Sequence, residues 1–168
     1  MGQEGAAALH RRLVLRTFRT AYAAGQATDA VLEIRFDGDS EGAIRHWLGF
    51  GGLCRPQIGK DLGERMAKAC EAAFGEGSPS VVIMGSDCPK LTPELLATAL
   101  DRLSAAPVIF GPANDGGYYL MGLSRMVPEL FRGISWGQET VLTESLRALE
   151  RLALRSNLLP PLDDVDRP

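Results

Sequence analysis

Residues 80–94 read SVVIMGSDCPKLTPE, and this stretch decides the fold because a buried strand, a turn and a helix start follow one another in it. The run SVVIMG (80–85) is apolar without alternation, which is typical of a strand that is covered on both faces. Thr92 and Pro93 match the preferred cap and first-turn residues of a helix. Asp87 stands between the two elements, and open α/β sheets bind their ligands at the carboxyl ends of strands.

Strand-like and helix-like segments alternate along the rest of the chain. Besides 80–85, apolar or β-branched runs predict strands at 29–36, 107–113 and 118–123. Amphipathic spacing predicts helices before residue 29 and over 41–49, 61–74, 93–104 and 137–154, whereas 50–59 is predicted to be a glycine-containing loop. The alternation predicts a single α/β domain over residues 1–168, with a mostly parallel sheet and helices on both faces.

The composition excludes several classes of partner. The 168 residues are 45% hydrophobic and 23% charged, as in an ordinary globular protein. A net charge of −3 offers no basic surface for a nucleic-acid backbone or an acidic membrane, and no apolar run approaches the roughly 20 residues of a membrane span. The three cysteines form no CxxC motif, so we expect reduced thiols in a cytoplasmic protein.

Asp87 is the first candidate for chemistry. Pro89 restricts Cys88 to extended geometry, which directs the aspartate out of the sheet edge. There its carboxylate would hold Mg²⁺ or Mn²⁺ beside a phosphate, because these ions bind one or two carboxylates together with substrate oxygens. The alternative is a structural aspartate that accepts hydrogen bonds from backbone amides of the following turn.

The segment GPANDGGYYLMG (111–122) is the second candidate. Asp115, Gly116 and Gly117 stand between two apolar runs, which is also a strong hairpin signal. Consecutive glycines would in addition let a ligand approach the backbone closely. The sequence leaves the structural and the functional interpretation open.

Two further groups are weaker candidates. Lys60 and Arg65 begin a helix after a glycine-rich loop, where they would approach a phosphate or would only cover an exposed helix face. The acidic tail that starts at Asp163 gains a role only if the chain brings it beside Asp87. The usual phosphate-loop, dinucleotide, serine-hydrolase and zinc-protease motifs are absent, so metal-and-phosphate chemistry is the class left open.

Five segments, in order, resemble one uncharacterised family of glycosyltransferase-like proteins. They are QIGKDLGERM, GSDCPKLTPELL, GPANDGGYYLMGL, LFRGISWGQETVL and DVDRP. That family is grouped with the type-A glycosyltransferase fold, the nucleotide-diphospho-sugar transferase superfamily, and the similarity covers nearly the whole chain. The resemblance implies a fold of that type and a nucleotide or nucleotide sugar as the small-molecule partner.

The resemblance also implies a metal site. Asp87 matches a G-D-x-P-like turn whose aspartate binds the catalytic metal in the superfamily's nucleotidyltransferases. Asp166 matches a late acidic segment that completes the site, although Arg167 replaces the usual threonine and adds a positive charge there. Mg²⁺ or Mn²⁺ is the implied cofactor.

On the acceptor side of the cleft, Asp115, Gly116 and Gly117 match the family's D-G-G-Y-Y segment. We expect Asp115 to be catalytic together with Asp87. We expect Gly111 and Tyr118, from the same stretch, to bind substrate along with the two glycines.

The sequence departs from the family at its start. Family members normally begin with a mid-sheet strand and a basic, glycine-containing loop that holds phosphates. Here the first segment, GQEGAAALHRRLVLRTF, corresponds to the helix after that loop. A fold without this first strand would leave two neighbouring strands with unpaired backbone groups, each costing about 1–3 kcal/mol if buried.

The leading hypothesis is therefore a metal-dependent nucleotidyl- or glycosyltransferase that acts on a nucleoside triphosphate or a nucleotide sugar. A hydrolase of the same substrates, with water as acceptor, stays open. The alternative from another class is a non-catalytic, N-terminally shortened α/β module that binds a ligand or associates with itself as a homo-oligomer.

Overall fold

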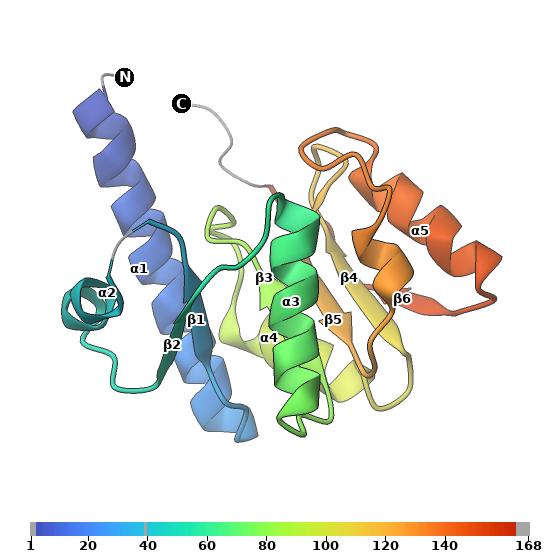
Figure 1. Ribbon diagram of the computed structural model, residues 1–168, viewed down its shortest axis with the longest axis horizontal. Coiled ribbons are helices and arrows are strands. Elements are labelled where there is room, and N and C mark those ends of the chain that lie inside the picture. The colour runs from blue at the N-terminus through green and yellow to red at the C-terminus, as the bar shows by residue number, and fades with distance from the viewer. Residues whose placement is uncertain (1–2, 39, 164–168) are drawn as a thin grey trace.

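The computed structural model describes residues 3–38 and 40–163. Helices and strands follow one another as the sequence predicts (Figure 1). The elements are α1 (Gln3–Thr28), β1 (Glu33–Phe36), α2 (Glu41–Leu48), β2 (Leu53–Pro56), α3 (Leu62–Gly75), β3 (Val81–Met84), α4 (Pro93–Arg102), β4 (Val108–Pro112), β5 (Tyr118–Leu123), the 3-10 helix η1 (Pro128–Phe131), α5 (Val141–Arg151) and β6 (Ser156–Leu158). The prediction of a loop over 50–59 is wrong in its middle, because β2 lies there.

The strands form two separate sheets. One pairs β1 with β2 in parallel, and the other has the order β3-β5-β4-β6. In the larger sheet β4 and β6 are parallel, while β5 runs antiparallel to both of its neighbours. Thus β3, β4 and β6 point the same way, and β5 is the reversed arm of a hairpin whose turn is 113–117. The α/β class and the prevailing strand direction are confirmed, whereas both ladders of β5 are antiparallel because of that hairpin.

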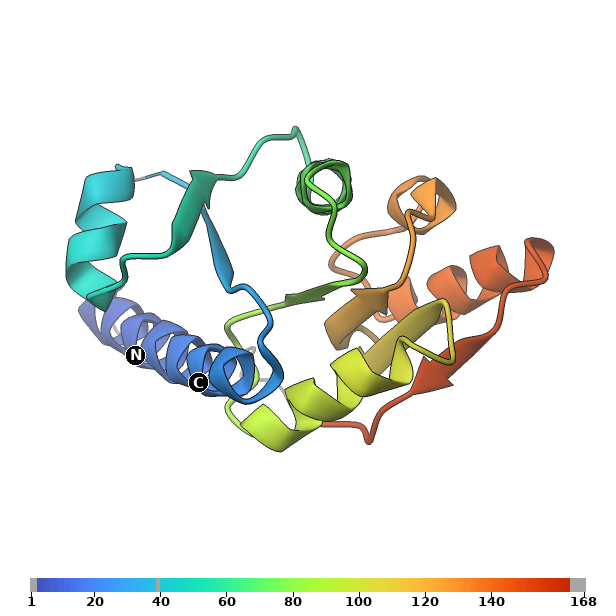
Figure 2. The same ribbon diagram turned by 90° about the horizontal axis from the view of Figure 1, so that it is seen from below.

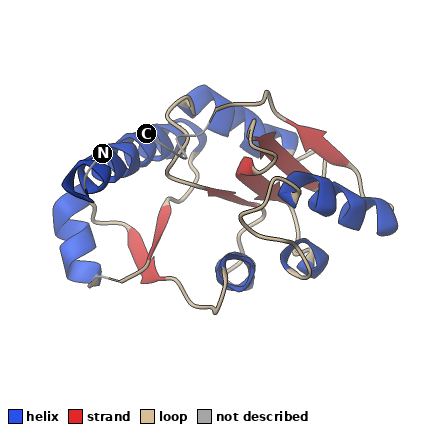
Figure 3. Cartoon of the chain, turned by 90° about the horizontal axis from the view of Figure 1, so that it is seen from above, coloured by secondary structure: helices blue, strands red, loops and turns tan. Residues whose placement is uncertain are grey.

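Helices cover both faces of the larger sheet, as predicted (Figures 2 and 3). On one face α1 packs against α4, and Val82 and Met84 of β3 point into the apolar cluster there. On the other face lie α3, η1 and α5, and Val81 and Ile83 point into a second apolar cluster. This division explains the continuous apolar run, because successive side chains of a strand point to opposite faces and both faces are covered.

Side-chain caps begin helices α2, α3 and α4, and the cap at Thr92 is the one predicted above from the sequence. The hydroxyl of Ser40 accepts a hydrogen bond from the N–H of Ala43 at the start of α2, at 3.2 Å. Thr92 does the same for Leu95 in α4, at 3.3 Å. Such caps satisfy backbone donors that the helix cannot, and their removal typically costs about 1 kcal/mol.

One edge of β1 and one edge of β3 are unpaired within the described part of the chain, because β1 pairs only with β2 and β3 only with β5. The N–H of Gly85 donates to Tyr119 O, and the pairing alternates along an antiparallel ladder. The backbone groups of Val82 and Met84 therefore face the unpaired edge of β3. From the sequence resemblance we expect two neighbouring strands with unpaired backbone groups. Strands β1 and β3 each have such an edge.

The expectations from composition also have structural counterparts. Cys54, Cys70 and Cys88 are buried and form no disulfide with one another, which agrees with the prediction of reduced cysteines. No helix in the part of the chain that the structure describes has both the length and the apolar character that crossing a membrane requires.

Candidate functional site

The predicted site residues that the structure describes lie at one edge of the fold, where strands β1 to β4 and β6 end (upper edge in Figure 1). Asp87 follows β3, Asp115 follows β4, and Asp163 follows β6. Lys60 and Arg65 lie in the connection from β2 to α3 and in the first turns of that helix. The strand-end position that the sequence assigns to Asp87 is the position it has.

Asp87 is exposed at the turn after β3. Its carboxylate folds back over Gly85, since a Cβ on that glycine would lie 2.6 Å from Asp87 Oδ1. The turn is anchored on α1, where the hydroxyl of Thr17 donates to Ser86 O at 3.4 Å. Within the described residues nothing donates a hydrogen bond to the Asp87 carboxylate. The structural interpretation of this aspartate, as an acceptor for amides of its own turn, is therefore not realised.

Asp163 is brought beside the Asp87 turn. Its carboxylate pairs with the ammonium group of Lys90 and accepts a hydrogen bond from the side-chain amide of Asn114. The Cys88 thiol lies 3.6 Å from the carbonyl oxygen of Asp163. Hydrogen bonding to Lys90, then to Asn114, lowers the pKa of Asp163, and the same contact raises the pKa of Lys90. We call Lys90, Asn114 and Asp163 the Asp163 clamp.

The Asp115 side chain makes a hydrogen bond within the β4–β5 turn. Its Oδ1 accepts a hydrogen bond from the N–H of Gly117 at 2.9 Å, which is the local bond that aspartates make in turns. Gly116 has a φ of +92°, and a Cβ there would lie 2.0 Å from Glu139 O. The hairpin interpretation is thus realised, and the loop before α5 packs tightly on the turn. The catalytic role of Asp115 stays a prediction.

Gly111 and Tyr118 lie in β4 and β5, the two strands that this turn joins. A Cβ on Gly111 would meet the Tyr119 ring at 2.4 Å, so only glycine fits. The Tyr118 ring lies between Phe110, with 5.0 Å between ring centroids, and Trp136, at 6.3 Å. Burial raises the pKa of Tyr118. Packing accounts for both residues, and their contact with substrate stays a prediction.

Arg65 is held by groups at the ends of β1 and β2. Its Nη1 donates to Asp37 Oδ2 at 2.7 Å and to Gln57 Oε1 at 3.2 Å, and its Nε donates to Gly59 O at 3.3 Å. Lys60 is exposed nearby. The hydrogen bonds and ion pairs of the described residues do not connect this group to the Asp163 clamp, and β1 and β3 belong to separate sheets.

Of the side chains that the structure describes at this edge, Asp87 is suited to bind a divalent metal. Among residues 3–38 and 40–163, no three His, Cys, Asp or Glu side chains converge into a metal-binding cluster. Mg²⁺ needs fewer protein ligands than that, since it binds through one or two carboxylates plus substrate phosphates and waters. Asp87 is exposed and has no partner among the described residues, so it fits such a role, whereas Asp166 lies outside them.

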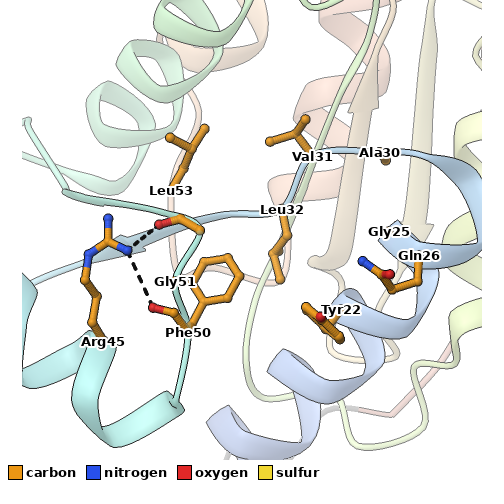
Figure 4. A pocket seen from close by; sticks show the side chains of 11 residues that line it. Tyr22, Gly25, Gln26, Ala30, Val31, Leu32, Arg45, Phe50, Gly51 and Leu53 are labelled. Carbon is orange, nitrogen blue, oxygen red and sulfur yellow. Dashed lines mark hydrogen bonds between the residues drawn. The ribbon is translucent and has the colours of Figure 1, made fainter.

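An open apolar groove of 440 Å³ lies elsewhere, between α1, the start of β1 and the loop before β2 (Figure 4). Tyr22, Val31 and Leu53 line it, and Arg45 donates to the carbonyl oxygens of Gly52 and Phe50 at 2.5 and 3.5 Å. The groove lies at the amino ends of β1 and β2, away from Asp87. Ligands of open α/β sheets bind at the other edge.

Sequence reasoning missed Lys90 and Asn114 as members of the site. Their contacts with Asp163 span 73 and 49 positions of the chain, a separation that no local pattern reports. The signal that could have found them is their position, since each lies in a connection that follows a strand of the same sheet.

Comparisons with known proteins identify the family and the fold of the chain. The model of a family described as "Uncharacterized protein conserved in bacteria (DUF2064)" matches residues 20–138. A crystal structure from Desulfovibrio desulfuricans G20, of a protein provisionally named a nucleotide-diphospho-sugar transferase, is 36% identical with a TM-score of 0.89; the match covers 99% of this chain and 72% of that one. No curated protein matches the chain.

Two more distant solved structures share the fold. Rv0371c from Mycobacterium tuberculosis H37Rv is 18% identical with a TM-score of 0.57, over 92% of this chain and 78% of that one. A CMP:2-keto-3-deoxy-manno-octonic acid synthetase complexed with CTP is 13% identical with a TM-score of 0.52, over 86% of this chain and 78% of that one.

Proposed function

Since the chain belongs to the DUF2064 family and has the nucleotide-diphospho-sugar transferase-like fold, we propose that it is a metal-dependent transferase that acts on a nucleoside triphosphate or a nucleotide sugar. The single observation that carries the proposal is Asp87. Within the described residues its exposed carboxylate has no hydrogen-bond or ion-pair partner, and at the carboxyl end of a strand whose two faces are covered it is available to a ligand.

The proposed roles follow the residues' positions. Asp87 and Asp166 would hold Mg²⁺ or Mn²⁺, which when bound neutralises phosphate charge and stabilises the leaving pyrophosphate or nucleoside diphosphate. Asp115, with Gly116 and Gly117, would orient the acceptor through the turn that its carboxylate closes. Nucleotidyl and glycosyl transfer share this arrangement.

Binding of the phosphates is assigned to cations at the same edge. Arg65 is oriented by Asp37 and Gln57, and Lys60 is exposed beside it, so both can meet an anion at the start of α3. The distant synthetase, which was solved with CTP, supports a nucleotide as the class of substrate. A cytoplasmic location is proposed with it, because the three cysteines form no disulfide with one another.

A thermal-shift panel tests the proposal. The probes are ATP, CTP, GTP and UTP and their common sugar diphosphates, each with and without Mn²⁺. A ligand at about 100 times its Kd stabilises by about 2.7 kcal/mol, which corresponds to a rise in Tm of about 5–10 °C for a domain of this size. We expect that rise for at least one nucleotide, and only in the presence of Mn²⁺.

Two variants locate the response. Asp87→Asn keeps the shape of the side chain and should abolish the Mn²⁺-dependent shift. Asp101→Asn is the matched control, because Asp101 is an exposed aspartate on the neighbouring helix α4 and has no proposed role. A Mn²⁺-dependent shift of equal size in native protein and in Asp87→Asn would refute the metal assignment.

The unpaired edges of β1 and β3 favour a second candidate function, a non-catalytic module that associates with itself through strand pairing. Light scattering from about 1 to 200 µM tests it, with Val82→Pro as the variant. That change removes an N–H that faces the unpaired edge and spares the ladder to β5, so it should weaken association. A monomer at every concentration would count against this candidate.

A further inference from the structure

The segment after β6 is attached to the larger sheet by its backbone. Leu162 N–H donates to Pro112 O at 3.0 Å, and the N–H of Asn114 donates to Leu162 O at 3.1 Å. Farther back, the N–H of Leu159 donates to a carbonyl oxygen of β4 at 2.8 Å. These bonds hold the segment up to residue 162, so the side chain of Asp163 is not needed to attach it.

The Asp163 carboxylate nevertheless receives donors from two different connections. Its Oδ2 pairs with the ammonium group of Lys90, in the connection from β3 to α4. Its Oδ1 accepts a hydrogen bond from the side-chain amide of Asn114, in the β4–β5 turn. Each carboxylate oxygen therefore has its own donor, and contacts to both oxygens of one anion are a specific way in which proteins hold carboxylates and phosphates.

Both donors lie at the edge of the sheet where ligands bind. Lys90 follows Asp87 by three residues, and Asn114 precedes Asp115 by one. Strands β3 and β4 point the same way, so their carboxyl ends bring the two connections to the ligand edge of the sheet. The carboxylate between the donors, in contrast, is supplied by the segment that follows β6.

The contact is open to exchange with a ligand. The side chains of Lys90 and Asp163 are 60% and 56% exposed, and Asn114 is exposed as well, so a small anion can reach both donors from solvent. Ion pairs with such exposure contribute little to folding, because water screens them. The Asp163 side chain can therefore leave its donors at low cost, while the backbone bonds of Leu162 stay in place.

The negative charge at this edge acts on both anions in the exchange. Asp87 and Asp115 lie in the same connections as the two donors, and their carboxylates repel any anion there. An incoming carboxylate or phosphate group meets the repulsion that the Asp163 carboxylate already experiences. The two donors, and not the net charge of the edge, therefore favour an anion at this position.

We propose that Lys90 and Asn114 form a binding site for an oxyanion, a carboxylate or a phosphate group of a ligand, and that Asp163 occupies this site as an internal ligand in the free protein. The incoming anion takes the place of the Asp163 carboxylate between the two donors, while the segment up to residue 162 stays on the sheet. The site goes beyond the proposed transferase function, because it uses no metal and no residue that is assigned to the reaction.

Amide NMR of the full chain, in buffer free of divalent cations, tests the site. Inorganic phosphate and acetate are titrated separately, with chloride keeping the ionic strength constant, and the backbone N–H signals of residues 90, 114 and 163 are followed. Asp163→Ala removes the internal ligand, whereas Lys90→Met and Asn114→Ala each remove one donor. The amide spectrum of each variant also shows that it is folded.

Two control variants separate the site from general effects of charge. Asp101→Ala removes the same negative charge from an exposed residue of α4, so it reports how charge alone changes the affinity for anions. Lys68→Met removes an exposed lysine that pairs with Glu64 on α3 at 2.9 Å, so it is matched to Lys90→Met.

We expect saturable shifts in native protein and a Kd about 2- to 6-fold lower in Asp163→Ala, because an internal ligand held by an ordinary exposed ion pair no longer competes. Lys90→Met and Asn114→Ala should each raise the Kd, and both control variants should keep the native value. Saturation by phosphate alone would support the site for phosphate groups, and saturation by acetate would support it for carboxylates.

Four results would overturn the inference. With neither probe giving saturable shifts in native protein and in Asp163→Ala, there is no anion site. An equal Kd in these two proteins would exclude Asp163 as its internal ligand. A native Kd in Lys90→Met or in Asn114→Ala would exclude the pair of donors, and an equal gain in Asp101→Ala would assign the effect to charge alone.

Discussion

Replacing Gly63 by alanine tests how the loop before α5 packs on α3. A Cβ at Gly63 would lie 2.3 Å from Trp136 Nε1 and 2.8 Å from Phe131 O. Gly75 ends the same helix and has no neighbour within 4 Å of its Cβ position. The two glycines therefore separate the steric effect of a methyl group from its effect on the helix.

Two effects of the added methyl group on the free energy of unfolding oppose each other, a gain in helix propensity and a steric cost. Alanine in place of glycine favours a helix interior by up to about 1 kcal/mol, and less at a helix end. Forcing a methyl group into a filled site costs about 1–3 kcal/mol, and here the cost lies toward the upper end because the Phe131 oxygen belongs to the backbone and cannot rotate away. We expect Gly63→Ala to destabilise the protein by about 1–2 kcal/mol and Gly75→Ala to be neutral or stabilising by up to about 1 kcal/mol.

Urea unfolding followed by circular dichroism measures both changes, and equal m-values confirm that the unfolding reaction is the same. In thermal melts Gly63→Ala should lower the Tm by about 2–8 °C. Adding Trp136→Phe, which shortens the ring, should recover part of the loss. If Gly63→Ala stabilises as Gly75→Ala does, or if Trp136→Phe recovers nothing, Trp136 does not pack on Gly63 in solution.

Three further predictions concern local interactions. The Ser135 N–H, and after it the Thr140 hydroxyl, lowers the pKa of Glu144, so its stabilisation is present above the unfolded-state pKa and is lost as the pH falls through the folded-state pKa. Glu144→Gln should accordingly flatten the fall in Tm between about pH 6 and pH 3, and an unaltered fall would contradict it. Burial raises the pKa of Cys70 to about 12, so mass spectrometry should find this thiol alkylated by iodoacetamide only after unfolding in urea. Thr92→Ala should cost about 1 kcal/mol in urea unfolding, and a change near zero would rule out the cap.

The predictable part of the fold is the part with strong local patterns. The run at β3 predicts that both of its faces are covered, and Val81 and Val82 are partly buried against different apolar clusters. Strand β2, LCRP, offers only four residues with one arginine and one proline, and β6, SNL, is a three-residue edge strand. Neither strand is long enough to show an alternation of apolar and polar residues. Each is therefore recognised by its pairing with a neighbouring strand and not by its sequence.

The candidate site also has a part that local sequence patterns predict and a part that they do not. The location of Asp87 could be predicted because it depends only on where one strand ends. The sequence could not show whether Asp115 closes a hairpin turn or binds a ligand, because both interpretations use the same residues. The hydrogen bond from the Gly117 N–H to the Asp115 carboxylate is the observation that supports the hairpin. The contact of Lys90 with Asp163 depends on the parallel pairing of β6 with β4, which is a property of the sheet and not of either segment.

Strand β6 is short and lies at the edge of the larger sheet, and this has a consequence for the order in which the protein loses structure on heating. Edge strands with few buried contacts open at lower free energy than the core, without global unfolding. Opening of β6 would release Asp163 from Lys90 while the apolar cluster on the face of α3 and α5 stays packed. On gentle heating we therefore expect the amides of the β6 segment to exchange with solvent while the rest of the domain is still folded.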